Sequence, residues 1–134
     1  MRSLFALSVL TLAVAGCDDT IFEGGEGGEI PDDAVGFEGV QAVVDTHCLG
    51  CHSAGSALGD LDLETDLHGA IVGVNGAYGL PIIDPGSLET SMFYLKTANQ
   101  QGADGTDMPP GTGGLSAPEN EIIAGWILDD APAQ

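Results

Sequence analysis

The residues that could carry chemistry are concentrated between His47 and His52, in the stretch HCLGCH. Cys48 and Cys51 stand three positions apart and His52 follows directly, which gives the pattern C-x-x-C-H. This pattern is the attachment signature of c-type haem. Two thiols at this spacing can add to the two vinyl groups on one edge of a porphyrin, and the imidazole of His52 can then bind the iron. The motif therefore predicts one covalent haem c with iron bound by His52.

Met108 is the candidate for the other axial position on the iron. It lies in TDMPPG between glycine-rich stretches, and Pro109 disfavours helical backbone at Met108. A short loop stiffened by Pro109 and Pro110 can hold a thioether against the iron. Met92 is the competitor, but it falls in SMFYL, which predicts a helix with Met92 on its apolar side, as in a core. A histidine or an open sixth position is the remaining alternative.

Three other kinds of site compete with haem attachment at Cys48 and Cys51. A redox dithiol of the thioredoxin type opens a helix, whose N-terminus stabilises the thiolate, whereas the apolar spacing over 37–44 places this motif at the end of a helix. A zinc site would add His47 or His68 to the motif, but a second C-x-x-C or an H-x₃₋₅-H pair is missing. A structural disulfide is the third alternative. We expect His47 and His68 to be surface residues.

The elements that must position these residues are predicted to be helices. Apolar periodicity indicates a helix over 37–47, a short one over 65–72, one that starts at Ser87 or Ser91, and a last one over 116–129. Gly39 either weakens the first helix, by about 1 kcal/mol relative to alanine, or permits a close approach of another helix. The stretch 73–85 is expected to be a loop that covers one haem face with Ile82 and Ile83.

The last helix has the clearest start signal. Ser116 and Glu119 form a capping box, and Pro118 is tolerated in the first turn. Apolar residues then recur through the helix, and they include Trp126, the only tryptophan. We expect Trp126 to be a core residue, packed on the first helix near the haem edge.

The first residues have the pattern of an export signal. A short positive start with Arg2 precedes the apolar stretch 4–14. The tetrapeptide VAGC at 14–17 closes this segment. This tetrapeptide resembles the bacterial lipobox, which implies cleavage before Cys17 and acylation of its thiol and new amine; an ordinary signal peptide is the alternative. Stable membrane anchoring takes two or more lipid signals. The expected protein is exported and anchored facing the periplasm, in the inner or the outer membrane.

Composition divides the chain into four parts. After the signal peptide at 1–16, residues 17–34 are acidic and rich in glycine, and such a stretch cannot bury enough surface to offset the entropy of ordering it. It is predicted to be a flexible tether that begins at lipidated Cys17. The predicted domain spans 35–131, and 132–134 form a tail.

Charge excludes some classes of partner. The 134 residues carry 2 Lys and Arg against 21 Asp and Glu, a net charge of -19. Without Arg2, only Lys96 remains, so no basic face exists for nucleic acid. No apolar run reaches the 18 residues of a membrane-spanning helix. The acidity predicts either a redox partner protein with a basic docking face, or a role in solubility or a salty habitat.

The segment 35–131 resembles the class I mono-haem cytochromes c, and more narrowly the planctomycete-type cytochrome c domains. The resemblance rests on C-x-x-C-H at the end of a helix, the Met108 loop and the closing helix, together with LDL at 61–63, PGS at 85–87 followed by Ser91, and LS at 115–116. It implies an all-α fold of three to five helices wrapped around one covalently bound haem, after the flexible tether. The lysines that surround the haem edge in basic cytochromes are missing, so their docking partners do not carry over.

The same resemblance implies single-electron transfer through a haem ligated by His52 and Met108. The expected protein is an electron carrier rather than an enzyme, either alone or as a subunit of a larger oxidoreductase, and it has no small-molecule substrate. A haem-based ligand sensor or a small peroxidase is the alternative if the sixth position on the iron is open. A zinc-binding or lipid-tethered interaction module is a third possibility.

Overall fold

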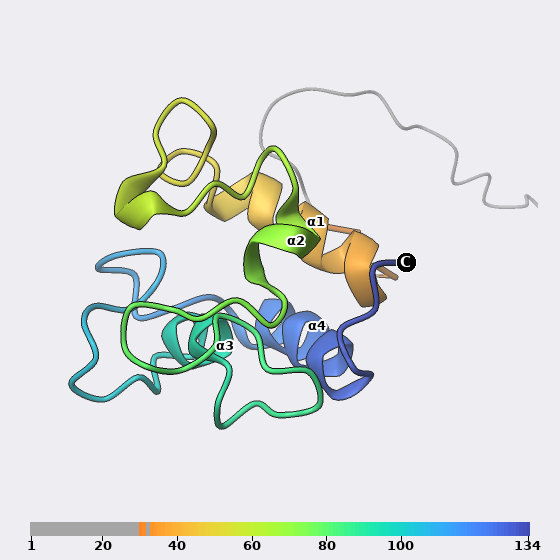
Figure 1. The fold of residues 1–134 in the computed structure, drawn as a ribbon. Helices are drawn as coiled ribbons and strands as arrows, with labels where there is room; N and C mark the ends of the chain where they lie inside the picture. Colours follow the sequence, from red (N-terminus) through yellow and green to blue (C-terminus); the bar gives the residue numbers. More distant parts are fainter. Residues whose placement is uncertain (1–29, 32) are drawn as a thin grey trace, which may run out of the picture.

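A computed structural model describes residues 30, 31 and 33–134 of the chain. The predicted signal peptide, Cys17 and most of the predicted tether lie outside the described residues, so these features stay predictions. The described part contains four α-helices and a single 3₁₀ turn, linked by long connections (Figure 1). The elements in order are α1 (Gly36–His47), η1 (Leu58–Asp60), α2 (Leu67–Ile71), α3 (Met92–Thr97) and α4 (Ala117–Leu128).

The all-α prediction is confirmed for the described residues, which form isolated β-bridges but no strand. Helix α2 is shorter than the predicted 65–72, because the side chain of Asp66 accepts a hydrogen bond from the backbone N–H of Gly69 and so caps the helix. Helix α3 starts after Ser91 rather than after Ser87. The buried Ser91 hydroxyl donates to the backbone carbonyl of Ser87, which ties the preceding turn to the start of the helix.

The main core lies between α1 and α4. Their facing apolar side chains are buried, among them Val40, Val43, Ile123 and Ile127. A Cβ built on Gly39 would lie 2.7 Å from the Cγ2 atom of Ile122, so a larger residue would force the two helices apart. The interpretation of Gly39 as a close-approach residue is therefore confirmed.

The two helices run antiparallel. His47, at the end of α1, contacts Glu119 at the start of α4, and Phe37, at the start of α1, packs on Trp126 near the end of α4. Trp126 is 1% exposed and its ring nitrogen donates to the carbonyl of Pro132. The prediction that Trp126 is a core residue packed on the first helix is confirmed.

His68 is half-buried rather than a surface residue, which corrects the expectation from its polar neighbours. Its ring stands edge-on to Phe37 and Trp126, with centroids 5.7 and 6.3 Å away, and its Nε2 lies 2.9 Å from the carbonyl of Ala131. Helix α2 therefore contributes Leu67 to the core and His68 to the aromatic cluster around Trp126.

The predicted loop over 73–85 is confirmed, and it is held by backbone contacts. Gly73 donates to the carbonyl of Ile83, and Ile82 donates to that of Val74. Ile83 is fully buried in the core and takes no part in the cavity described below, so the expectation for Ile83 is wrong.

In the described part of the chain, no helix is both long enough and apolar enough to span a bilayer.

Candidate functional site

A cavity of about 830 Å³ brings the predicted site residues together. Cys48, Cys51, His52 and Met108 all line it. Its volume lies within the range of small-molecule and cofactor pockets, about 300–1,000 Å³. The apolar part of the wall comes from loops and from η1, α2 and α3, and it includes Leu58, Leu61, Leu63, Ala70, Val74, Ile82, Phe93 and Leu115.

The C-x-x-C-H residues form a tight turn where α1 ends. Cys48 is the C-cap of the helix, and its backbone N–H donates to the carbonyl of Val44. The N–H groups of Cys51 and His52 both donate to the carbonyl of Cys48, at 3.1 and 2.9 Å. The carbonyl of His52 in turn accepts from the N–H of Leu63 at 2.8 Å. The helix end and this turn therefore present both thiols and the imidazole to one cavity.

The imidazole of His52 has a buried nitrogen that nothing in the described residues satisfies. Its Nδ1 is inaccessible to solvent and has no hydrogen-bond partner there. Buried polar side-chain atoms are nearly always hydrogen-bonded, and an exception in a cavity points to a missing ligand. Two thiols, an imidazole and a thioether around apolar walls form the donor set that a covalently attached haem requires, so the residues fit this group.

The two cysteines do not have the environment of a redox dithiol. Both are free thiols, and Cys48 sits at the C-terminal end of α1 rather than at a helix N-terminus. Burial, and after it the nearby Cys51, raise the pKa of the Cys48 thiol to about 11. Thioredoxin-type cysteines have a lowered pKa, so that the thiolate is available near neutral pH. The geometry therefore counts against this alternative.

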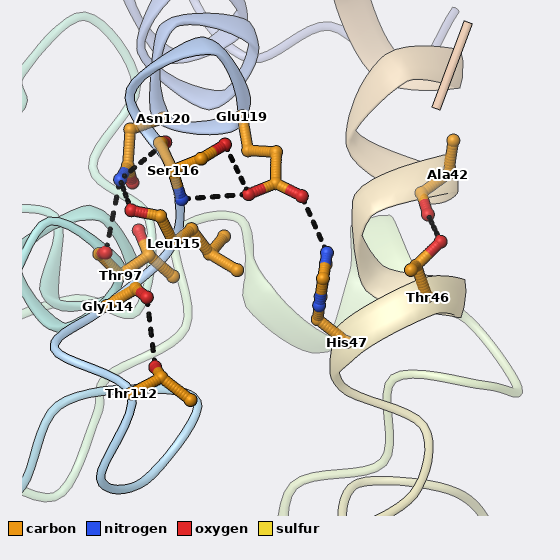
Figure 2. A network of polar contacts seen from close by, with 10 residues as sticks. All are labelled: Ala42, Thr46, His47, Thr97, Thr112, Gly114, Leu115, Ser116, Glu119 and Asn120. Atoms are coloured by element: carbon orange, nitrogen blue, oxygen red, sulfur yellow. Dashed lines mark hydrogen bonds and ion pairs between the residues drawn. The ribbon is translucent and has the colours of Figure 1, made fainter. Parts of the chain in front are cut away.

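A zinc site has no support either. His47 is exposed, as predicted, and its Nε2 lies 2.6 Å from the carboxylate of Glu119 (Figure 2). His68 is held in the aromatic cluster around Trp126. Within residues 30–134, apart from residue 32, no three His, Cys, Asp or Glu side chains are grouped to hold a metal ion.

The contact of His47 belongs to a network that joins the motif to α4. The second carboxylate oxygen of Glu119 accepts from the N–H and the hydroxyl of Ser116, at 2.8 and 2.6 Å (Figure 2). Partial burial acts to raise the pKa of Glu119, but the hydrogen bonds from Ser116 and His47 outweigh it and hold the pKa below its usual range. The predicted capping box is confirmed, and it also positions the residue that precedes Cys48.

Both candidate methionines border the cavity, and they differ in how they are held. Met92 is the first residue of α3 and is 5% exposed, which confirms its assignment to the packed interior. Met108 is half-buried and lies in a loop, as predicted. Its backbone N–H donates to the carbonyl of Lys96 at 3.0 Å. The structure thus presents Met108 from a loop attached to α3.

Three residues at or beside the cavity were not recognised in the sequence. Lys96 and Tyr78 line it, and the Lys96 ammonium lies 4.8 Å from the centre of the Tyr78 ring. Asp107 accepts hydrogen bonds from the backbone N–H groups of Gly111 and Gly113 and so folds the Met108 loop. The sequence feature that could have indicated Lys96 as a cavity residue is its position four residues after Met92, which places the two on one helix face.

Trp126 does not border this cavity, so the expectation that it lies near the haem edge is wrong. It lines a second hollow of about 1020 Å³ instead, with Ile30, Val35 and Ile122. Because α1 and α4 are antiparallel, the end of α4 that carries Trp126 meets the start of α1, far along the helix from Cys48. This second hollow has no thiol, thioether or unpaired imidazole in its wall.

One comparison with known proteins identifies the cavity-forming segment. Residues 48–111 match a family model described as planctomycete cytochrome C. No curated protein and no solved structure matches the chain. The matched segment starts at Cys48 and ends three residues after Met108, so it contains all four predicted site residues in the cavity wall. Residues 48–111 are therefore similar to the planctomycete cytochrome C family, which is consistent with a cytochrome c-like domain.

Proposed function

We propose that this protein is an exported c-type cytochrome, tethered to a membrane, that transfers single electrons through one covalent haem ligated by His52 and Met108. The family match indicates a haem-binding electron-transfer role. The observation that supports the finer proposal is the common cavity of Cys48, Cys51, His52 and Met108.

The residues would divide the work as follows. Each cysteine thiol adds across a vinyl double bond, with sulfur bonding to one carbon and the hydrogen going to the other, so the attachment needs no oxidant. When bound, haem supplies a one-electron Fe(III)/Fe(II) couple. His52 and Met108 would hold the iron, and a thioether ligand would raise the reduction potential. Apolar walls exclude water from the site, which tunes the potential further.

The direct test is a haem stain of the purified protein after denaturing electrophoresis. Wild type should stain, because thioethers survive denaturation, and the double variant Cys48→Ser/Cys51→Ser should not. Cys17→Ser is the matched control, because it removes a cysteine outside the C-x-x-C-H motif, and it should stain like wild type. Absence of stain from wild type made in a cell that matures c-type cytochromes would refute the proposal.

The ligation can be tested separately by spectroscopy. Native protein should show the weak red absorption band of a ferric methionine–iron bond and should not bind CO readily, because Met108 occupies the sixth position. If that band is missing and the native ferrous protein binds CO, the protein is better described as a ligand sensor or a small peroxidase.

The tether rests on the sequence alone, through the resemblance of VAGC to a lipobox. Replacing Cys17 by serine should release the protein from the membrane fraction into the soluble periplasm, because both acyl attachment points are lost. A Cys17→Ser variant that stays with the membranes after a high-salt wash would contradict the lipid anchor. The partner that we propose is a redox protein with a basic face, and the membrane contact is the anchor itself.

A further inference from the structure

We propose that Lys96 is a positioning residue that holds the Met108 loop over the cavity and so controls how readily Met108 leaves the iron. The proposal rests on the proposed function, since it takes Met108 as an iron ligand. Lys96 and Arg2 are the only two Lys or Arg residues in the sequence. The sole cation of the predicted domain therefore lies at the wall of its cavity.

Lys96 contacts the backbone of the Met108 loop at three points. Its ammonium donates to the carbonyls of Asp104 and Thr106, at 2.8 and 3.0 Å. Its own carbonyl accepts the N–H of Met108 at 3.0 Å. Hydrogen bonds from a charged donor are stronger than those between neutral groups. One residue of α3 thus fixes the loop before Met108 and at Met108 itself.

The packing around the ammonium leaves little freedom. The Lys96 Nζ lies over the Tyr78 ring, 4.8 Å from its centre, in a cation–π contact. Gly105 passes close beside both groups, with a φ of +83°, and a Cβ there would meet the Tyr78 hydroxyl and would lie 3.0 Å from the Lys96 Nζ. Ring, ammonium and loop backbone therefore form one packed unit.

No other described residue replaces Lys96 in this role. The remaining hydrogen bonds of 104–108 run within the loop, as in the contacts of Asp107 with Gly111 and Gly113. The far end of the loop is attached separately, by the N–H of Leu115 on the carbonyl of Thr97. Among the hydrogen bonds of the described part, only those of Lys96 join 104–108 to the rest of the fold.

The attachment of the loop should determine how tightly a competing ligand binds the iron. An external ligand such as imidazole binds the iron only in the fraction of molecules in which Met108 has left. Its apparent affinity rises in proportion to that fraction. Weakening the attachment of 104–108 should therefore raise the imidazole affinity without changing the haem attachment.

The experiment titrates imidazole into ferric holoprotein and follows the methionine–iron band. In Lys96→Met, which keeps the length of the side chain and removes its charge and donors, imidazole should bind at least about tenfold more tightly. Lys96→Arg keeps charge and donors and should stay within about threefold of wild type. Gln41→Glu changes the net charge by the same amount as Lys96→Met, at an exposed site of α1 outside the cavity, and should match wild type.

Other outcomes overturn the inference. Equal affinities in Lys96→Met and wild type would show that the contacts do not position Met108, and equal increases in Lys96→Met and Gln41→Glu would show an effect of net charge. If Lys96→Met does not fold, Tyr78→Leu removes the packing partner of the ammonium and should give the same direction of change.

A second readout separates this inference from the proposed function. Amide hydrogen exchange at 104–108 should be faster in Lys96→Met than in wild type, and unchanged in Gln41→Glu. A wild type without the methionine–iron band refutes the proposed ligation, whereas a wild type with the band and unaltered exchange in Lys96→Met refutes only the role of Lys96.

Discussion

Met92 and Met108 border the same cavity but differ in what their side chains do for the fold. Met92 is buried at the start of α3, where it fills space between the helix and the cavity. Met108 is half-buried in a loop whose backbone is tied to Lys96. A packed methionine contributes mainly to stability, whereas a loop methionine at a cavity is free to act as a ligand.

Alanine variants of the two methionines should therefore separate these roles. Met108→Ala should lose the methionine–iron band while it keeps its covalent haem. Met92→Ala should keep the band and lose about 2–5 kcal/mol of unfolding free energy, the usual range for a buried methionine. Absorption spectra and urea unfolding of both holoproteins measure this, and loss of the band in Met92→Ala alone would show that the ligand assignment is wrong.

Asp107 is the residue that folds the Met108 loop back on itself. Its carboxylate accepts from the N–H of Gly113 at 2.7 Å, from the Thr106 hydroxyl at 2.9 Å and from the N–H of Gly111 at 3.4 Å. The hydrogen bond from Gly113 is the largest cause that lowers the pKa of Asp107, followed by that from Thr106. The charged form is therefore the one that the folded loop favours.

This shift predicts how the stabilisation depends on pH. Because the folded pKa is below the unfolded value of 3.8, the Asp107 contribution is fully present above pH 3.8 and is lost as the pH falls through the folded pKa. Asp107→Asn should speed amide exchange of Gly111 and Gly113 at neutral pH, and the difference from wild type should shrink in acid. Asp104→Asn, one charge fewer in the same loop, is the control, and an equal effect there would contradict a specific role for Asp107.

At the scale of elements, the antiparallel packing of α1 on α4 holds the motif in place. One end of the pair is closed by the hydrogen-bond contact between His47 and Glu119, and the other by the contact of Phe37 with Trp126. Between them, Gly39 allows the backbone of α1 to approach Ile122. Since Cys48 directly follows α1, the angle and depth of this packing decide where the thiols enter the cavity.

Two glycines in these helices should respond to alanine in opposite ways. At Gly39 the new Cβ would lie 2.7 Å from Ile122 and 3.0 Å from the backbone of Ala34, so we expect Gly39→Ala to cost about 1–3 kcal/mol. At Gly125, in α4, a built Cβ would meet no heavy atom within 4 Å beyond its chain neighbours and the backbone of its own helix, so Gly125→Ala should stabilise by about 0.5–1 kcal/mol. Urea unfolding measures both; stabilisation by Gly39→Ala would contradict the close approach.

At the scale of the whole molecule, acidity dominates the surface. The net charge of -19 comes from 21 carboxylates against two cations, and Lys96, the only cation of the predicted domain, is engaged in the Met108 loop. No basic group is left free there to attract an acidic partner. A surface of one sign raises the encounter rate with partners of opposite sign, and salt screens this effect.

Electron transfer to small redox reagents should therefore depend on their charge. A cationic reagent should react faster than an anionic one at low ionic strength, and the two rates should converge as salt is added, since the Debye length falls to about 10 Å at 0.1 M. Stopped-flow kinetics over a salt series measure this, with a neutral reagent as the control. Electron-transfer rates that do not change with ionic strength would favour solubility or a salty habitat as the reason for the acidity.

Local features of the fold were predictable from the sequence because short-range forces set them. The helix ahead of the motif follows from the 3.6-residue spacing of its apolar side chains, and the start of α4 follows from Ser116 and Glu119, whose side chains satisfy backbone groups three residues away. The starts of α2 and α3 were less certain, because Thr65, Ser87 and Ser91 all carry plausible cap chemistry and only the Asp66 and Ser91 contacts decide between them.

Contacts between side chains that lie far apart in the sequence were not predictable from local patterns. His68 has a polar environment in the sequence, but tertiary packing brings it against Phe37 and Trp126, which lie 31 and 58 residues away along the chain. The expected packing of Trp126 on the first helix is confirmed, but Trp126 does not border the cavity, because α1 and α4 run antiparallel and their relative direction is not encoded in a local pattern. Ile82 and Ile83 are neighbours in the loop, yet only Ile82 reaches the cavity.

The sequence by itself determined the chemical identity of the candidate site, since C-x-x-C-H and the Met108 loop are local patterns whose residue types and spacing specify their chemistry. Only the tertiary structure decided that these two patterns, 56 residues apart from His52 to Met108, share one cavity, and that Lys96 ties the second pattern to α3. The physical reason is that such contacts depend on how the helices pack and the loops close, which is a property of the whole chain rather than of any short segment of it.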